Sequence, residues 1–459
     1  MQHGEQSRGG GAEEAGIAGE FQDRCGGGLH EQAVDFAHLS SLVGIEWVRE
    51  ALKRSGAETI RRRKLPNEVV VWLVIGIALF REWSIDLVVK HLGIGGKATG
   101  SVRTPTGSPV SSAAVAQARR RVGIEPLVEL FSISGESWVR EFEDLNRWRA
   151  LSLFGLDGST LRIPDTAANE EVYGRPGSSR SKAGYPQARL IGVLALGSRI
   201  LSDFTVGTLE QGEQTLAEML LGNLPDRSLL DRGFVNYGTF ARLARAGTER
   251  HFLCRAKKGL RATLVRNLGR GDILVELKVS PRHRREDPSL AASITVRMLD
   301  YQIKGFRPSR LFTSLLDSEA YPARELVELY HERWEIELAY DELKTHTLER
   351  QEALRSKQPD TILQEICGLL IAYNLVRVLM ARAARAAGVD PCRMSYRNSL
   401  LEARVFLLSA WAVAPGALPR HYKMLCEELT HLVLPKRRTR RYPRAVKIKM
   451  TSYKRKTTN

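Results

Sequence analysis

The spacing of apolar residues changes character about a third of the way along this chain. From Leu29 to about Val122 apolar residues recur at helical spacing, and the unbroken apolar run 69–80 predicts a buried helix. Pro66 suits the first turn of that helix. We therefore expect an all-α N-terminal domain at 29–125, preceded by a disordered, Gly-rich segment at 1–28.

Apolar runs of strand length begin near Leu151. The runs 152–156 and 228–230 are followed at once by Asp157 and Asp231, which predicts two strands that each deliver an aspartate at the carboxyl end. Two further runs, 190–196 and 200–206, predict a hairpin turned at Gly197-Ser198, followed by helices near 214–221 and 240–246. Four later runs also have strand length: 251–255, 273–279, 293–299 and 311–315. The block 251–316 therefore reads as an all-β insertion.

Helical spacing returns at about residue 317. Within it, the stretch 330–344 places Tyr330, Arg333, Glu337 and Lys344 within an arc of about 60° on an ideal helix. Leu329, Ile336, Ala339 and Leu343 lie about 100° away, so the helix has an apolar side to bury and a charged side to present. The simplest interpretation of such a face is a solvated surface with helix-spaced ion pairs. We expect further helices through 386–434.

The net charge of the chain indicates what kind of partner it binds. The 459 residues include 69 Lys and Arg against 52 Asp and Glu, a net charge of +17, which favours a polyanion such as nucleic acid or an anionic membrane. A basic tail without acids occupies 435–459. The apolar run 69–80 is too short to span a bilayer, and the five scattered cysteines have no Cys-x-x-Cys spacing, so we expect a soluble protein without disulfides or zinc.

Asp157, Asp231 and Glu337 would form a cluster of three carboxylates if the helix packs over the two strand ends. Such a cluster needs a cation, and carboxylate oxygens suit two Mg²⁺ ions, for which Mn²⁺ can substitute. Two ions could activate a nucleophile and stabilise the leaving oxygen of a phosphodiester. A strand-end aspartate taken alone is more often a turn or a helix cap. Three rivals stay open on chemistry alone: Asp341 against Glu337, and Asp203 and Asp226 against Asp231.

These residues carry a specific resemblance. Asp157 in Gly-Leu-Asp-Gly-Ser-Thr, Asp231 in Leu-Leu-Asp-Arg-Gly-Phe, and the spacing Tyr330, Arg333, Glu337, Lys344 resemble the DDE transposases of bacterial insertion sequences, in particular the insertion-sequence-four family. Leu354-Arg-Ser-Lys357 and Ala372-Tyr-Asn-Leu375 are similar to that family too, and residues 29–122 resemble its N-terminal domain.

The resemblance implies an α/β fold. An RNase H-like catalytic core at 147–250 and 317–385 would be interrupted by the β-rich insertion 251–316. The all-α domain at 29–125 would then bind DNA, and C-terminal helices at 386–434 would follow the core.

The resemblance also implies a reaction and a set of roles. Asp157, Asp231 and Glu337 would hold the metal ions and carry catalysis, selecting Glu337 over Asp341. Tyr330, Arg333 and Lys344 would contact DNA phosphates beside the cut and steady a displaced base. Trp334 could stack on such a base, although a core or interface tryptophan is the commoner interpretation.

The implied enzyme binds the inverted repeats at the ends of an insertion sequence, cuts them through a hairpin intermediate and joins them to target DNA. It would act as a homodimer on double-stranded DNA in the bacterial cytoplasm, associated with the nucleoid and not with a membrane. Two other functions stay open: a related nuclease without strand transfer, and a DNA-binding protein or inactive transposase remnant without catalysis.

Overall fold

A computed structural model describes residues 43–59, 65–91, 110–176, 184–232, 237–243, 249–256, 261–303, 307–349, 353–409, 413 and 415–435. The Gly-rich segment 1–28 and all but the first residue of the tail 435–459 lie outside these ranges, as does the basic run 61–64.

The described residues before 142 form helices only. They are α3 (Ile45–Arg54), α4 (Asn67–Leu79), α5 (Ile85–His91), α6 (Ser112–Val122) and α7 (Glu125–Glu141). Helix α4 is apolar on every side, and all of its residues except Glu68 are buried. The apolar run in the sequence correctly predicted this helix, which packs against the long helix α14 (Pro359–Ala387).

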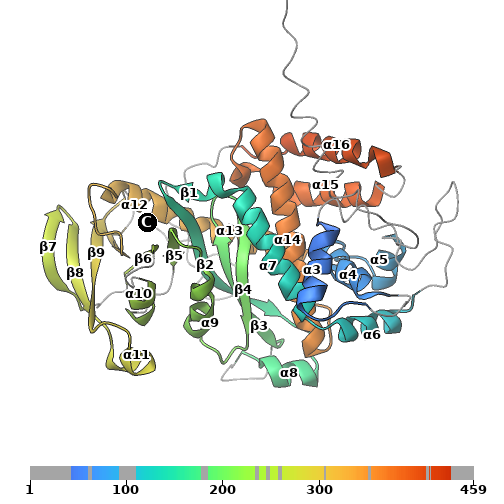
Figure 1. Ribbon diagram of the computed structural model, residues 1–459, viewed down its shortest axis with the longest axis horizontal. Helices are drawn as coiled ribbons and strands as arrows, with labels where there is room; N and C mark the ends of the chain where they lie inside the picture. Colours follow the sequence, from blue (N-terminus) through green and yellow to red (C-terminus); the bar gives the residue numbers. More distant parts are fainter. Residues whose placement is uncertain are drawn as a thin grey trace, which may run out of the picture.

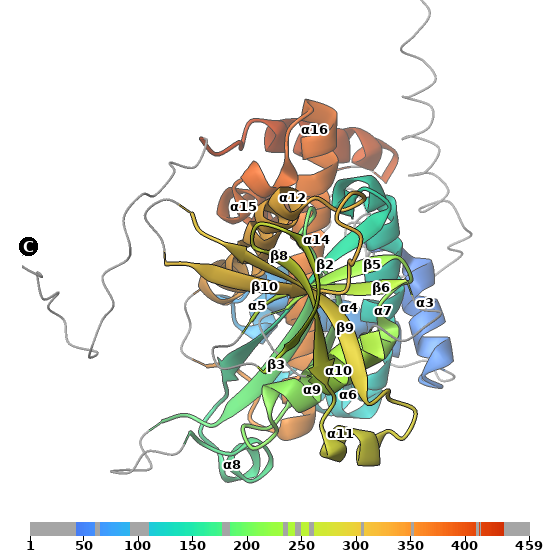
Figure 2. The ribbon, with the colours of Figure 1, turned by 90° about the vertical axis from the view of Figure 1, so that its left-hand side faces the viewer.

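One large twisted sheet forms the centre of the molecule (Figures 1 and 2), in the order β4-β3-β2-β5-β6-β10-β9-β8-β7. Strand β2 (Leu151–Arg162) pairs in parallel with β5 (Ser228–Arg232), which pairs in parallel with β6 (Arg250–Arg255). The hairpin of β3 (Gln187–Ala195) and β4 (Ile200–Gly207) follows the predicted ranges closely and extends the sheet beside β2.

The block 251–316 belongs to the same sheet. Its strands are β6, β7 (Thr263–Gly269), β8 (Asp272–Lys278), β9 (Ser293–Tyr301) and β10 (Ser309–Thr313). It also contains a helix, α11 (Pro281–Glu286), so the expectation of an all-β block is wrong in that detail. In Figure 1 strands β7–β9 lie at one end of the molecule and the N-terminal helices at the other.

Helices cover both faces of the sheet. Strand residues Phe154, Leu156 and Leu230 pack with α9 (Glu213–Leu220) and α10 (Tyr237–Leu243) on one face. Leu153 and Leu229 face the other side, where α12 (Ala323–Tyr330), α13 (Trp334–Asp341) and α14 lie. Shorter elements complete the core region: β1 (Arg147–Trp148), paired with β2, and α8 (Ala167–Tyr173).

Helix α14 is the central C-terminal element, flanked by α15 (Tyr396–Ser409) and α16 (Leu418–Thr430). Its length and composition would allow it to cross a membrane, but 94% of its most apolar window is buried inside this fold. Helix α14 is therefore a core helix of the protein.

Candidate active site

Strand β2 presents Asp157 on the face covered by α13. Side chains alternate along a strand, so positions 153, 155 and 157 share the face of the buried Leu153. The parallel register pairs Gly155 with Asp231. Position 231 therefore lies on the same face, at the carboxyl end of the neighbouring strand, as the sequence predicted. The side chain of Asp231 is outside the described part of the structure.

Helix α13 lies close over this face because β2 has a glycine beneath it. A Cβ added at Gly155 would stand 3.6 Å from Cβ of Ile336 and 2.9 Å from a methyl of Leu196. One turn further along α13, the hydroxyl of Tyr340 donates a 2.8 Å hydrogen bond to the backbone carbonyl of Asp157. Glu337 lies between these two contact points, so the helix brings it close to Asp157. The predicted end of the strand at Asp157 is wrong: β2 continues to Arg162 because it stays paired with β3, and only its pairing with β5 ends, at Leu156.

The two acids influence each other electrostatically. Burial raises the pKa of the Asp157 carboxyl, while the amide of Gly158, which donates to it at 2.8 Å, and the charge of Arg333 lower the pKa. The charge of Glu337 raises the pKa of Asp157 further. Glu337 is 37% exposed and pairs with Arg333, whose Nη2 is 3.1 Å from Oε1. The guanidinium of Arg333 thus interacts with both carboxylates.

The predicted continuous helix 330–344 is broken twice. A 3₁₀ turn at His331–Arg333 separates α12 from α13, and a π-helical turn at Glu342–Thr347 follows α13. The angles of an ideal helix therefore do not describe this stretch. Contacts nevertheless gather the predicted residues: the guanidinium carbon of Arg333 lies 6.0 Å from the ring centre of Tyr330. Within the π turn, Lys344 Nζ donates to Ser159 Oγ at 3.0 Å.

Two other residues singled out in the sequence, Trp334 and Asp341, are exposed. Trp334 is 41% exposed beside Arg333, so it is not a core tryptophan. Asp341, the rival of Glu337, is exposed and accepts a 2.8 Å hydrogen bond from Thr345. Sequence reasoning missed Tyr340 and Ser159. The alternation of β2 could have indicated Ser159, since it is two residues beyond Asp157, but no sequence signal marked Tyr340 as a partner of β2.

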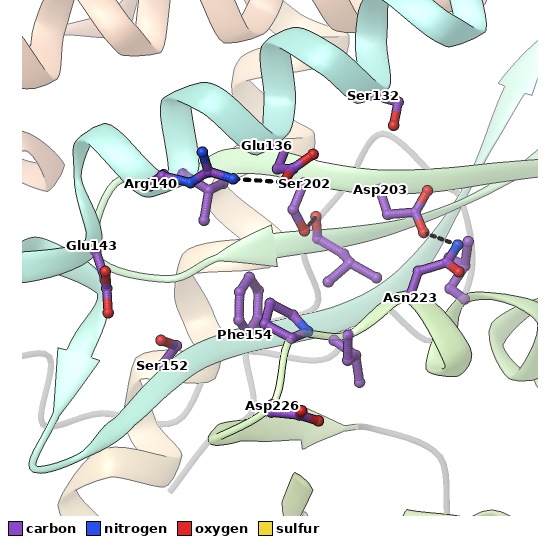
Figure 3. Close-up of a pocket in the computed structure, with 15 residues that line it drawn as sticks. Ser132, Glu136, Arg140, Glu143, Ser152, Phe154, Ser202, Asp203, Asn223 and Asp226 are labelled. Carbon is purple, nitrogen blue, oxygen red and sulfur yellow. Dashed lines mark hydrogen bonds and ion pairs between the residues drawn. The ribbon is translucent and has the colours of Figure 1, made fainter. Parts of the chain in front are cut away.

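Asp203 and Asp226, the rivals of Asp231, line a different cavity of about 440 Å³ (Figure 3). Asp203 lies on β4 and accepts a 2.9 Å hydrogen bond from Asn223, and Asp226 lies 3.5 Å from the guanidinium of Arg250. Phe154 also lines this cavity, which places it on the sheet face opposite Asp157. Neither aspartate therefore joins Asp157 and Glu337.

Comparisons with known proteins show the family of this chain. A family model described as the transposase DDE domain matches residues 148–375, and one described as the insertion element 4 transposase N-terminal region matches 33–132. The chain is 34% identical over 419 residues to the transposase InsG for insertion sequence element IS4 of Escherichia coli strain K12, which covers 90% of this chain and 92% of that protein. The chain belongs to the IS4 family of DDE transposases.

Two further similarities are more limited. The putative transposase InsZ of the same Escherichia coli strain is 31% identical over 223 residues, 48% of this transposase and 71% of that protein. Among solved structures, a piggyBac transposase synaptic complex with hairpin DNA covers 86% of this chain and 82% of its own, with 10% identity and a TM-score of 0.38. A TM-score of 0.38 does not establish a common fold. The DDE model spans Asp157, Asp231 and Glu337 of this transposase.

Proposed function

We propose that this transposase binds the inverted-repeat ends of an insertion sequence, cuts them and joins them to target DNA. The observation that carries the proposal is the convergence of Asp157 and Glu337, bridged electrostatically by Arg333, on the face where the neighbouring strand β5 carries position 231. A DNA-binding protein without catalysis has no need for acids held together in this way, because like charges in a partly buried site cost free energy.

The carboxylates of Asp157, Asp231 and Glu337 would hold two divalent cations. Within the described side chains no three acids, histidines or cysteines form such a cluster, and the side chain of Asp231 is not among those described. The donors nevertheless fit the group: they are carboxylate oxygens, which Mg²⁺ and Mn²⁺ prefer, and burial leaves Asp157 short of compensating positive charge. When bound, the ions would polarise the scissile phosphate and lower the pKa of an attacking water.

The cations around the carboxylates would position DNA. Arg333 can exchange its bond with Glu337 for a bidentate contact with a phosphate. Lys344 can exchange its hydrogen bond to Ser159 for a contact with a phosphate, which its ammonium would bind as a point charge. Trp334, exposed beside Arg333, would stack on a base displaced from the duplex. These roles suit a hairpin intermediate, in which the first 3′-hydroxyl attacks the opposite strand and the DNA must bend sharply.

The finer architecture belongs to the same proposal. The strands β2–β6 with α9, α10 and α13 would be an RNase H-like core, extended by the β-rich residues 251–316. The N-terminal helices α3–α6, within 29–125, would bind DNA ends, two protomers would pair the ends, and the protein would act in the cytoplasm on the nucleoid.

Purified transposase mixed with duplex end DNA and Mg²⁺ tests this function. We expect nicks, hairpins and products joined to a target plasmid, all of which disappear with a chelator. Nicks without joined products would indicate a nuclease instead, and a shifted but uncut band would contradict catalysis altogether. A duplex of scrambled end sequence is the matched control, and we expect it to stay uncut.

A further inference from the structure

Strand β2 continues beyond Asp157 into a basic region to which no role has been assigned. Ser159 holds the ammonium of Lys344, and the strand ends three residues later at Arg162, which is exposed. From Asp157 to Arg162 the strand advances about 16 Å. Alternation turns the side chain of Arg162 away from the face of Asp157 and Ser159, but its charge still acts on Lys344, so the two cations lie near each other. A nucleic acid strand leaving the carboxylates along β2 would therefore pass Lys344 first and Arg162, at the end of the strand, second.

A second basic segment is fastened to the same strand end. The backbone amide of Leu354 donates to the carbonyl of Arg162 at 2.9 Å, and Thr166 Oγ1 donates to the carbonyl of Lys357 at 3.1 Å. The exposed Lys357 therefore has its backbone fixed close to β2.

The segment 353–358 is held firmly from its other side as well. The carboxylate of the buried Glu365 accepts hydrogen bonds from the backbone amides of Arg355 and Ser356, each at 2.8 Å to one of its oxygens. Asn169 donates to the carbonyl of Ser356 at 3.4 Å. Because the backbone is fixed before any ligand arrives, little conformational entropy would be lost when Lys357 binds one.

The neighbouring acids are already committed to other partners. Asp165 and Glu170 both pair with Arg175, and Glu349 pairs with Arg404. Asp360 lies in the first turn of α14, where the helix dipole favours an acid. Within the described part of the chain, neither Arg162 nor Lys357 has an ion pair. Both cations are therefore available to bind an external anion.

The positive charge of Arg162 acts on Lys344. Burial lowers the pKa of the Lys344 ammonium, and the nearby charge of Arg162 lowers it further. No acid among the described residues offsets that repulsion at Lys344, which donates a hydrogen bond to the neutral hydroxyl of Ser159. An anion lying between Lys344 and Arg162 would relieve the repulsion.

We propose that Arg162 and Lys357 extend the phosphate contacts of Lys344 and bind the backbone of the DNA strand that leads away from the cleaved bond. The inference rests on the proposed function, because it assumes that DNA is cut at Asp157 and Glu337. It adds a contact surface made of the end of β2 and the segment 353–358. Its contacts are to phosphates, so the surface would hold DNA of any sequence.

Salt dependence of binding tests this surface directly. We would measure the affinity of the full-length protein for a duplex of the element end over a range of NaCl concentrations, with a chelator present to prevent cutting. Each lost phosphate contact should reduce the slope of log affinity against log salt by about 0.9. We expect that reduction for Arg162→Gln and for Lys357→Gln, and twice that reduction in the double variant.

Arg140→Gln is the matched control, because Arg140 is an exposed arginine on α7 that lines the cavity on the opposite sheet face and pairs with Glu136. Its slope should equal that of the wild type. A second measurement replaces single phosphates with neutral methylphosphonates: one position should weaken wild-type binding but leave Arg162→Gln unchanged, which a merely structural role of Arg162 would not produce.

Failure of this inference is distinguishable from failure of the proposed function. If the wild type cuts end DNA but both single variants keep the wild-type slope, Arg162 and Lys357 do not contact phosphates and the surface is wrong. If the wild type neither binds nor cuts end DNA, the proposed function itself is wrong. Both replaced side chains are exposed, so equal thermal unfolding of the variants should confirm that the fold is intact.

Discussion

At the scale of single residues, Asp157 shows how a functional group opposes folding. Its carboxylate is largely buried, and burial together with Glu337 raises its pKa, with Gly158 and Arg333 compensating only in part. A carboxyl whose pKa is higher in the folded than in the unfolded chain favours folding while it is protonated. That contribution is lost as the pH rises through the folded-state pKa. Above its folded-state pKa, the ionised Asp157 therefore destabilises the metal-free protein relative to an uncharged side chain at this position.

Replacing Asp157 with Asn should make the metal-free protein more stable at pH 7. The amide has the same shape and its oxygen can still accept from Gly158, but it carries no charge to desolvate. The gain should be largest at neutral pH and should shrink as the pH falls toward 4, the usual pKa of an aspartate in an unfolded chain. Urea unfolding in a chelator at several pH values measures it. A variant less stable than the wild type at pH 7 would contradict this explanation.

At the scale of elements, the position of α13 over β2 determines the geometry of the candidate site. Tyr340 fixes one end of the helix to the carbonyl of Asp157. The other side is held by Arg199, from the turn between β3 and β4, which pairs with Glu335 and with Glu342. Arg199 and Glu342 are almost fully buried, so these ion pairs are screened little by solvent.

Removing the hydroxyl of Tyr340 should weaken the attachment of α13 to β2 without leaving a cavity in the core. Tyr340→Phe keeps the ring but loses one hydrogen bond, so we expect a loss of about 1 kcal/mol in unfolding free energy. Because Glu337 lies on the same helix, cleavage should also need more Mg²⁺ for half-maximal rate, while affinity for end DNA stays unchanged. Titrating Mg²⁺ in the cleavage assay tests the role, and an unchanged requirement would make Tyr340 purely structural.

Many of the helices and strands could be predicted from the sequence because the spacing of apolar residues within each segment indicates them. A short apolar run identified the first half of β2, although the strand continues to Arg162, and a longer apolar run identified α4. The break of 330–344 into α, 3₁₀ and π turns was not predictable, because tertiary contacts such as Arg199 with Glu342 impose it on residues whose spacing suits a plain helix. Strand β7 was missed because its residues are exposed on both faces and lack alternation.

The candidate site likewise has a part that the sequence predicted and a part that it did not. Spacing within one segment pointed to Glu337 and to its neighbours Arg333 and Lys344. The bond between Tyr340 and Asp157, and the attachment of Leu354 to Arg162, join residues far apart in the chain. No local pattern records such pairings, so only the folded structure reveals them.

At the scale of the whole molecule, the N-terminal helices are joined to the sheet domain through buried charges. Arg81, which follows α4, pairs with Glu365 of α14, and both side chains are almost completely buried. Arg119 of α6 donates to the side chain of Gln364 and to the carbonyl of Thr361. The N-terminal helices therefore form one packed body with α14.

Glu365→Gln should strongly destabilise the whole protein. It leaves Arg81 buried without a counter-charge, and removing one partner of a buried pair costs about 3–5 kcal/mol. Urea unfolding measures the loss, and the N-terminal helices and the sheet should still unfold in one transition. Glu136→Gln, which removes the partner of an exposed pair on α7, is the control and should change the free energy of unfolding by less than about 0.5 kcal/mol. Equal effects of the two replacements would contradict a buried junction.

The central claim is that Glu337, together with Asp157 and Asp231, carries metal-dependent cleavage of DNA ends. The most direct measurement compares Glu337→Gln with Asp341→Asn, which neutralises an exposed acid on the same helix that accepts a hydrogen bond from Thr345. In Mg²⁺ with end DNA, we expect Glu337→Gln to bind the duplex but produce no nicks, hairpins or joined products. Asp341→Asn should cut at close to the wild-type rate. Normal cleavage by Glu337→Gln, or its loss in Asp341→Asn alone, would contradict the assignment.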